Sequence, residues 1–536
     1  MGRCLFKPNG GGMATHVNLD ALIRREDFEA VSDADDTQVK DSSPITDFTS
    51  DAFFYGALRK PDFQRETAEW DPARVVGLIR SFVDGELIPG VIVWKNKGLV
   101  FVIDGSHRLS ALIAWVQDDY GDGIASQEFF NHDIPDDQRK IADRTRKLVE
   151  KEFGSYDSHR KAIADPAAYG PEIVSRARRF GSISLPLQWV NGDAVKAEAS
   201  FVRINQRAAM ITPQELELIE SRRKPNAIAA RAIIRKGTGH QYWSKFPAET
   251  QQSLKDMATE LHGMMFEPAL QYPIKSLDMP ACGPVYSSTA LRQVYDFINL
   301  CTSAPSPKDD TSGGAVTVDY LKLCRRAMWL LLSNHKSSIG LHPAVYFYSW
   351  TGKQQPILFL VVAEMLIEYD RTNQIPQFIA SRKAFEDFLI NNRSLVAQVV
   401  RKFGTKASGI GHLRTFYELT LSMIGGGLAG AGLVEAITSN AAYSYLQPAE
   451  SPYDGTAPTR YSTQVKAGLV MRELLPTAIR CNICGGFVPS QAMSIDHKER
   501  KEDGGPSTVE NAQVSHPYCN TGYKEAQRAK SKKGSA

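Results

Sequence analysis

The chain lacks any uncharged apolar run of about 18 residues, the length that a membrane-spanning helix needs. Its first residues, MGRCLFKPNGGGM, also lack the apolar core of a signal peptide. No repeat of fixed period is present, which argues against a solenoid. These absences predict a cytoplasmic protein without a membrane partner.

Cysteine and net charge are both scarce. The chain has seven cysteines, an odd number, and Cys481, Cys484 and Cys519 gather near its carboxyl end, which favours metal ligation over a disulfide framework. The 63 Lys and Arg residues nearly balance the 60 Asp and Glu residues, so a nucleic-acid partner would need a local basic surface. A length of 536 residues exceeds what one hydrophobic core usually organises and predicts about two to four domains.

The amino-terminal part of the chain mixes strand and helix patterns. Residues 1–47 are polar and acidic without a sustained period, and they predict a mobile lead-in. Residues 48–225 predict an α/β domain, although 130–180 are rich in charge and indicate no clear element. The expected elements are a helix that Asp71-Pro72 opens and Gly85 ends, a hairpin of 91–94 and 99–103, a helix over 107–116, a strand over 183–190 and a helix over 194–204.

The remaining chain predicts a large helical region and a small module. Residues 226–447 are almost continuously helix-periodic, and a polar, proline-bearing linker is expected over 448–470, before a module over 471–536. A Gly-x-Gly-x-x-Gly pattern at 425–430 has no βαβ context, so it predicts a flexible joint or close helix packing instead of a dinucleotide site. The fold class is therefore α+β and multidomain, with a mostly helical middle.

Two pairs of metal-ligand residues frame the last module. Cys481-x-x-Cys484 and His516-x-x-Cys519 share one spacing, and four such ligands complete a tetrahedral zinc site. The segment between them is short and rich in glycine, so a structural metal would supply folding energy that apolar burial cannot. The alternative is a zinc ribbon that carries no chemistry.

The residues between and beyond these pairs point to catalysis. Asp496-His497 precedes a Gly-Gly loop and Asn511, and Asn520 follows the second pair. In this order they resemble the HNH family of metal-dependent nucleases, which have a ββα-metal fold. The resemblance implies that His497 is the general base and that Asn511 holds the loop beside it in register. It also implies that Asp496 and Asn520 bind a catalytic Mg²⁺ or Mn²⁺ ion, although Asn520 stands where the family name expects a third His.

A lysine-rich tail follows the second pair of metal ligands. Such a tail could contact phosphates and make binding sensitive to salt, or it could be a solvated terminus. The basic residues that are candidates for nucleic-acid binding are Lys524, Arg528, Lys530, Lys532 and Lys533.

A second candidate site lies near the amino terminus. Asp104-Gly105-Ser106-His107-Arg108 stands at the step from an expected strand to an expected helix. Backbone N–H groups and the helix dipole favour an anion at such a step. Arg108 could add a bidentate contact to a phosphate.

Together with 201–207, this cluster resembles the ParB/sulfiredoxin-like superfamily. The likeness is strongest to its Asp-Gly-Gln-His/Gln-Arg branch, found in GmrSD-type modification-dependent restriction enzymes and in phosphorothioation-linked defence proteins. It spans 61–220, with Pro61, Gln64 and Arg65 in the opening element, and it implies nucleotide binding or hydrolysis. Ser106 stands where the branch has Gln, which leaves the ligand open. The implied site residues are Asp104, Gly105, His107 and Arg108, with support from Asn205.

The two resemblances predict an anti-phage or restriction-type DNA endonuclease, a phosphodiester hydrolase whose amino-terminal domain binds NTP or senses modified DNA. An additional NTPase activity would fit that domain, and an oligomer is compatible with the sequence. The alternative is a nucleotide-switched, DNA-binding regulator whose zinc-held HNH fold is not catalytic. RNA also stays open as a target, because HNH chemistry acts on the phosphodiester.

Overall fold

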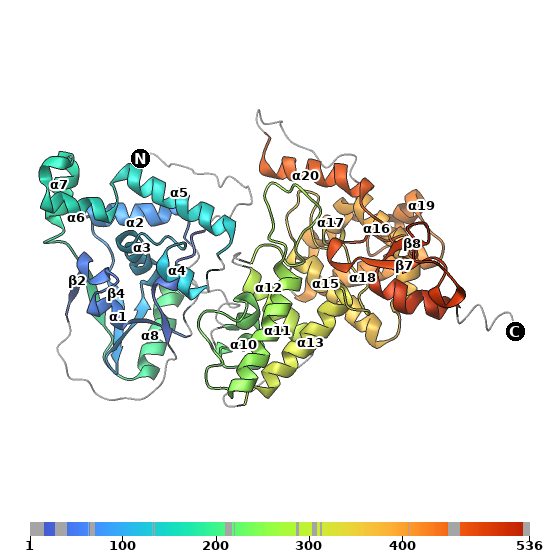
Figure 1. Cartoon of the computed structure of the whole chain (residues 1–536), viewed down its shortest axis with the longest axis horizontal. Helices are drawn as coiled ribbons and strands as arrows, with labels where there is room; N and C mark the ends of the chain where they lie inside the picture. Colours follow the sequence, from blue (N-terminus) through green and yellow to red (C-terminus); the bar gives the residue numbers. More distant parts are fainter. Residues whose placement is uncertain are drawn as a thin grey trace.

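The computed structural model describes most of the chain in two parts that lie side by side (Figure 1). A strand-containing part, blue to teal, stands beside a mainly helical part, green to red. No helix among the described residues is long and apolar enough to cross a membrane. The described residues are 16–26, 40–62, 64, 70–130, 132, 134–208, 217–218, 220–285, 289–302, 308–310, 313–405, 407–448 and 461–528.

A six-stranded sheet organises the amino-terminal part, in the order β1-β3-β5-β4-β6-β2. The predicted hairpin is confirmed, because β4 and β5 are antiparallel and meet at a turn in which Lys97 and Gly98 have positive φ. β3 runs parallel to β5, and β6 runs parallel to β4. The strands are β1 (Arg25–Glu26), β2 (Ser42–Pro44), β3 (Leu58–Pro61), β4 (Val91–Asn96), β5 (Leu99–Asp104) and β6 (Ser184–Trp189).

Helices cover both faces of this sheet. Val91, Val93 and Val102 pack into the larger core with the helices α2 and α3, whereas Trp94 and Phe101 face the helix α8. This alternation follows from the period of two along a strand. The helices of this part are α1 (Phe53–Ala57), α2 (Pro72–Asp84), α3 (Ser106–Gln117), α4 (Ile124–Phe129), α5 (Asp136–Glu152), α6 (Tyr156–Ala164), α7 (Pro171–Arg179) and α8 (Ala194–Ala208).

The capped helix at 72–84 is confirmed in detail. The Asp71 side chain accepts a hydrogen bond from Arg74 N at 2.8 Å, and Gly85 ends the helix in the left-handed conformation. The strand at 184–189 and the helices that begin at Ser106 and Ala194 are confirmed as well. Residues 130–180, which had no clear pattern, mostly form α5, α6 and α7.

The expectation of a mobile lead-in is wrong for residues 16–26 and 40–47. β1 extends one edge of the sheet beside β3, and β2 extends the other edge beside β6. Asp20 is buried and binds Arg25 and Lys60 at 2.8 and 2.6 Å. The sequence could not predict these elements, because the two edge strands are too short to show the two-residue period of a strand. The buried acid could not be predicted either, because cations from other segments neutralise it.

The middle of the chain is helical, as predicted, and nine of the sixteen residues of α15 (Pro356–Arg371) are buried. The glycine run at 425–430 is an exposed joint between α18 and α19, and at most of its glycines an added Cβ would meet only open space. The other helices are α10 (Pro225–Ile234), α11 (Ala248–Phe266), α12 (Ala290–Thr302), α13 (Ala315–Leu331), α14 (Pro343–Tyr346), α16 (Ile375–Asn391), α17 (Arg393–Phe403), α18 (Ala407–Gly425), α19 (Gly430–Ser439) and α20 (Thr463–Leu474).

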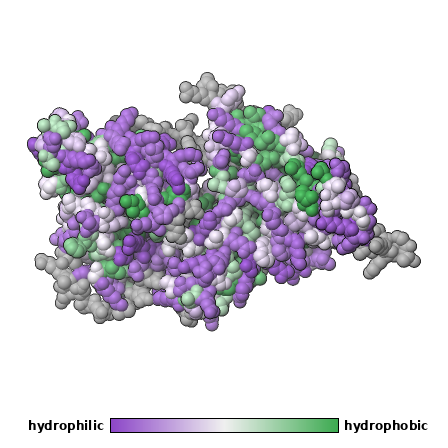
Figure 2. Space-filling view, viewed as in Figure 1, coloured by the Kyte–Doolittle hydropathy of each residue, from purple (hydrophilic) through white to green (hydrophobic). Residues whose placement is uncertain are grey.

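The last module is a small hairpin of β7 (Ser494–His497) and β8 (Ala512–Ser515), followed by a π-helical turn, η7 (Cys519–Tyr523). Its buried residues Phe487 and Val488 belong to the same hydrophobic core as the helices. α20 crosses the expected boundary at residue 471. Polar side chains dominate the face in Figure 2, and hydrophobic ones form separate patches, mainly over the carboxy-terminal half.

Candidate metal centre and active site

The four predicted zinc ligands lie together. One ligand atom from each of Cys481, Cys484, His516 and Cys519 falls within 4.8 Å of all the others. His516 Nδ1 faces the thiols, at 3.4 Å from Cys484 Sγ and 3.7 Å from Cys519 Sγ. Its Nε2 donates to Phe487 O at 2.9 Å, which fixes the ring so that Nδ1 is the coordinating atom.

The charges of this cluster suit a cation. Burial and nearby Arg382 lower the pKa of His516, so the imidazole is neutral and has a free lone pair. Hydrogen bonds among the three cysteines lower the pKa of Cys481 and raise the pKa of Cys484 and Cys519, which favours one thiolate that the other two thiols stabilise. Three sulfurs and one imidazole nitrogen are a donor set that fits a metal such as zinc.

A tight knuckle presents the first two ligands. Cys481 N donates to Gly486 O at 2.8 Å, and Gly485 has a φ of 72°, which only glycine adopts readily. Ile483 N lies 3.4 Å from Cys481 Sγ and so points at the sulfur. The backbone therefore supports the thiolate charge before any metal contributes.

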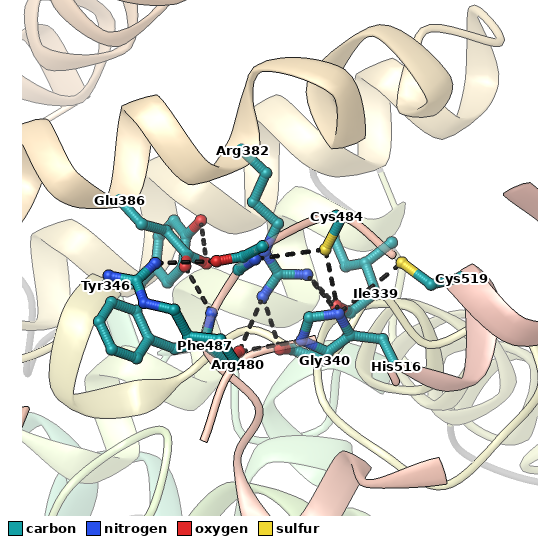
Figure 3. A network of polar contacts seen from close by, with 12 residues as sticks. Ile339, Gly340, Tyr346, Arg382, Glu386, Arg480, Cys484, Phe487, His516 and Cys519 are labelled. Carbon is teal, nitrogen blue, oxygen red and sulfur yellow. Dashed lines mark hydrogen bonds and ion pairs between the residues drawn. The ribbon is translucent and has the colours of Figure 1, made fainter. Parts of the chain in front are cut away.

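A buried ion pair from the helical part lies directly behind the knuckle (Figure 3). Arg382 and Glu386 of α16 have no exposed side-chain surface, and Arg382 Nε donates to Glu386 Oε1 at 2.7 Å. Glu386 Oε2 accepts from Phe487 N at 2.6 Å, and Arg382 Nη2 donates to Phe487 O at 3.3 Å. Arg382 Nη1 also lies 3.4 Å from His516 Nδ1. The helical part thus holds the backbone that orients the zinc-ligand histidine.

Arg382 binds a third segment, the loop between α13 and α14. It donates to Ile339 O, and to Gly340 O at 2.8 Å. A Cβ at Gly340 would stand 2.7 Å from His516 Cδ2, so glycine is needed for this approach. This network was not predicted from the sequence, where its one visible signal is an Arg and a Glu one turn apart on the apolar face of α16.

The hairpin β7–β8 presents Asp496 and His497 at its end. Asp496 is buried, and its Oδ2 accepts from Gln513 Nε2 at 2.7 Å and from Lys524 Nζ at 2.6 Å. His497 is half-buried, and its Nε2 lies 3.1 Å from Ser507 Oγ. The carboxylate is therefore enclosed by donors, whereas the imidazole reaches toward the loop.

Asn511 fastens the loop that follows His497. Its Oδ1 accepts from Glu499 N at 2.9 Å, and its Nδ2 donates to the carbonyls of Glu499 and Pro506 at 2.9 and 2.8 Å. A Cβ at Gly505 would clash with Glu499 O and stand 2.9 Å from Asn511 Nδ2, so only glycine fits beside the backbone that Asn511 bonds. All three polar contacts of this amide are to backbone, as a loop-holding residue requires.

Asn520 comes to the hairpin from the π-helical turn. Its Nδ2 donates to Ser494 Oγ at 3.0 Å and to Ile495 O at 3.4 Å, which sets the plane of the amide. A π-helical turn often accompanies a functional site because it shifts a side chain out of α-helical register. The carboxamide oxygen of Asn520 and the carboxylate of Asp496 are the hard donors that Mg²⁺ prefers.

The lysine-rich tail is described only in part. Lys524 is not directed to solvent, because its ammonium lies against Asp496 and donates to His497 O at 2.5 Å. Arg528 pairs with Glu525 at 3.1 Å. Lys530, Lys532 and Lys533 lie outside the described residues.

The amino-terminal cluster forms the expected step from strand to helix. β5 ends at Asp104, Gly105 has a φ of 93°, and α3 begins at Ser106. Arg108 Nη2 pairs with Asp104 Oδ2 at 2.7 Å and donates to Gly90 O at 3.2 Å. The guanidinium is thus engaged by the chain itself.

Aromatic stacking adds a second feature to this cluster. The rings of Trp70 and His107 stack with centroids 5.6 Å apart. Asn205 lies in α8, but its side chain is outside the described residues, as is Arg65. Trp70 was not among the predicted site residues, and no local sequence signal marks it.

The chain has a hairpin that ends in Asp-His and is framed by a Cys/His cluster, and this hairpin is docked on a helical core beside an α/β domain. These features define a multidomain chain with an HNH-like module. The comparisons with known families agree. Residues 46–219 match the GmrSD restriction endonuclease N-terminal domain, and residues 481–525 match the HNH endonuclease family. No curated protein and no solved structure matched the chain. The chain is therefore similar in these two regions to a GmrSD-type HNH restriction enzyme, which supports a nuclease of the restriction type with DNA as its partner.

Proposed function

We propose that this chain is a metal-dependent DNA endonuclease whose reaction takes place at the end of the β7–β8 hairpin. The observation that carries the proposal is the convergence of four polar residues from three segments. Asp496 and His497 end β7, Asn511 bonds the loop beside them, and Asn520 bonds the first residues of the same strand.

In this proposal His497 is the general base. Its Nδ1 takes a proton from the attacking water, while Nε2 bonds the Ser507 hydroxyl at 3.1 Å, which orients the ring. Asn511 keeps the following loop from moving the histidine, since its amide bonds three backbone groups. Asp496 and Asn520 would hold a Mg²⁺ or Mn²⁺ ion, which when bound neutralises charge on the phosphate.

The zinc centre would act as a structural support in the same proposal. Zinc at Cys481, Cys484, His516 and Cys519 would fix the knuckle and the start of η7, so that Asn520 follows directly from a ligand. The module is small and shares its core with the helices, so the metal and the core together hold the hairpin.

A cleavage assay tests the assignment of the base. His497→Ala should lower the rate of DNA cleavage by about 10²–10⁴-fold, the usual contribution of a general base. The substrates are plasmid and phage DNA, modified and unmodified, with Mg²⁺ or Mn²⁺ and with or without NTP. Glu502→Ala is the matched control, because this side chain is 81% exposed on the neighbouring loop.

The outcomes separate the candidate functions. Unchanged cleavage by His497→Ala, with zinc content intact, would remove His497 from the reaction. Binding of DNA without any nicking by the wild type would favour the nucleotide-switched regulator. A preference for modified phage DNA would support the role in anti-phage restriction that the amino-terminal match suggests.

We further propose that the amino-terminal cluster binds a nucleotide. Support comes from the step between β5 and α3, where backbone N–H groups and the helix dipole favour phosphate, and from the Trp70 ring beside it. Asp104→Ala and Arg108→Ala should weaken binding of fluorescent ATP or GTP about tenfold or more. Arg80→Ala, on an exposed pair of α2, is the control. Equal binding by all three variants would refute this assignment.

A further inference from the structure

The Asp496 carboxylate already holds a cation from within the chain. Lys524 Nζ lies 2.6 Å from Asp496 Oδ2, and the same ammonium donates to His497 O at 2.5 Å. The two side chains are enclosed, since Asp496 is 7% and Lys524 13% exposed. One lysine therefore bonds both residues of the Asp-His pair.

Neighbouring cations are bonded elsewhere. Lys498 Nζ donates to Glu510 O at 2.7 Å, and Arg500 binds Asp503 at 2.7 Å and Glu525 at 3.4 Å. In the described part of the chain, Lys524 is thus the cation that lies on Asp496. Gln513 donates to the same carboxylate oxygen, but it brings no charge.

We propose that Lys524 is the resident cation of the catalytic site, and that it competes with the divalent ion for Asp496. Like charges repel strongly in a partly buried site, so an ion that uses this carboxylate must displace the ammonium or share it at a cost. A lysine can leave because its four-carbon side chain is flexible. This inference rests on the proposed function, in which Asp496 is a metal ligand.

A competing role and a merely structural role of Lys524 predict opposite changes in metal affinity. If Lys524 only positioned Asp496, its removal would disorder the carboxylate and weaken metal binding. If Lys524 competes, its removal leaves a buried carboxylate without a counter-charge, and metal binding becomes tighter. The sign of the change in affinity therefore decides between the two roles.

The experiment measures Mn²⁺ binding to the full-length, zinc-loaded protein by electron paramagnetic resonance. Lys524→Met should lower the Mn²⁺ dissociation constant about tenfold, the scale of one competing charge at short range. Lys524→Arg keeps the cation and should bind like the wild type. Lys498→Met is the matched control, since it removes a nearby lysine that does not bond Asp496, and it should change the constant less than about twofold.

A second neutral variant guards against a folding failure. Lys524→Gln keeps a donor for His497 O, and it too should bind Mn²⁺ more tightly; zinc content and melting temperature report the fold of both variants. Equal or weaker Mn²⁺ binding by the folded neutral variants would overturn the competition. Asp496→Ala is the separate arm for the proposed function, because it removes every side-chain donor at this position: Mn²⁺ binding that survives this change would show that Asp496 is not a ligand.

Discussion

The buried pair of Arg382 and Glu386 allows a quantitative prediction about how the nuclease module is held. Arg382→Met removes a guanidinium that donates to Glu386, to Gly340 O at 2.8 Å and to Phe487 O at 3.3 Å. Burial opposes the charge of Arg382, but Glu386 raises the pKa of this guanidinium above its ordinary value, so Arg382 is charged in the fold. The variant would leave the Glu386 carboxylate buried without a counter-charge.

The size of the effect follows from that unpaired charge. Removing one partner of a buried ion pair usually destabilises a fold by about 3–5 kcal/mol. Glu386 would keep two donors, Tyr346 O–H at 3.0 Å and Phe487 N–H at 2.6 Å, which places the expected loss at about 3 kcal/mol. In Arg382→Met/Glu386→Gln the charge is gone and an amide oxygen can still accept from Phe487. This double variant should recover about 1–2 kcal/mol relative to the single variant.

Denaturant unfolding of the zinc-loaded full chain, followed by tryptophan fluorescence, measures these differences. Chelator-induced zinc release is the second readout, and it should be faster in Arg382→Met because the Phe487 carbonyl that bonds His516 loses its own hydrogen bond from Arg382. Arg371→Met is the control, since its side chain is 73% exposed in its pair with Glu368 and should contribute little to stability. A single variant as stable as this control, or a double variant no more stable than the single one, would refute the reasoning.

Two further predictions concern pH and metal. Burial lowers the pKa of His342 to about 4, so the unfolded chain takes up a proton near pH 6.5 that the folded chain refuses. The stability that this group contributes is present above pH 6.5 and is lost as the pH falls toward 4. In His342→Asn the slope of the unfolding free energy against pH should be shallower by up to about 1.4 kcal/mol per pH unit, as measured by urea unfolding at several pH values. An unchanged slope would contradict this prediction. Cys484→Ser should lower the zinc content well below one ion per chain and reduce the melting temperature, as a chelator should in the wild type. Mass spectrometry of the metal measures the zinc content, and calorimetry measures the melting temperature. Full zinc retention would exclude Cys484 as a ligand.

Local patterns in the sequence predicted local structure well. The helix between Asp71 and Gly85 depends on a cap and a stop signal that lie within the helix ends, so the sequence contains all the information needed. The four predicted zinc ligands lie together for a similar reason, because each pair sits on one short turn; their role as ligands stays a prediction. In both cases the interacting groups are close along the chain.

Partners that are far apart along the chain could not be predicted in this way. Lys524 stands at the start of a lysine-rich tail, which suggested phosphate contact, yet its partner Asp496 lies 28 positions earlier and the ammonium is enclosed. Arg382 contacts Phe487 across 105 positions. The sequence around Asp20 resembles any polar, acidic segment, and it gives no sign that Lys60 and Arg235 lie beside this carboxylate. Periodicity reports burial of apolar residues, and it carries no signal for buried charges.

Two buried charge contacts join parts of the chain that the sequence predicts as separate domains. At one end Arg235, at the close of α10, lies 3.4 Å from Asp20 of the amino-terminal part. At the other end Arg382 of α16 binds the backbone carbonyl that holds His516, a predicted zinc ligand. Both contacts are nearly free of solvent, and a buried charge has few alternative partners, so movement at either joint is opposed strongly. The helical part therefore serves as a rigid support for the nuclease hairpin, and a signal from the amino-terminal part would have to reach the hairpin through these helices.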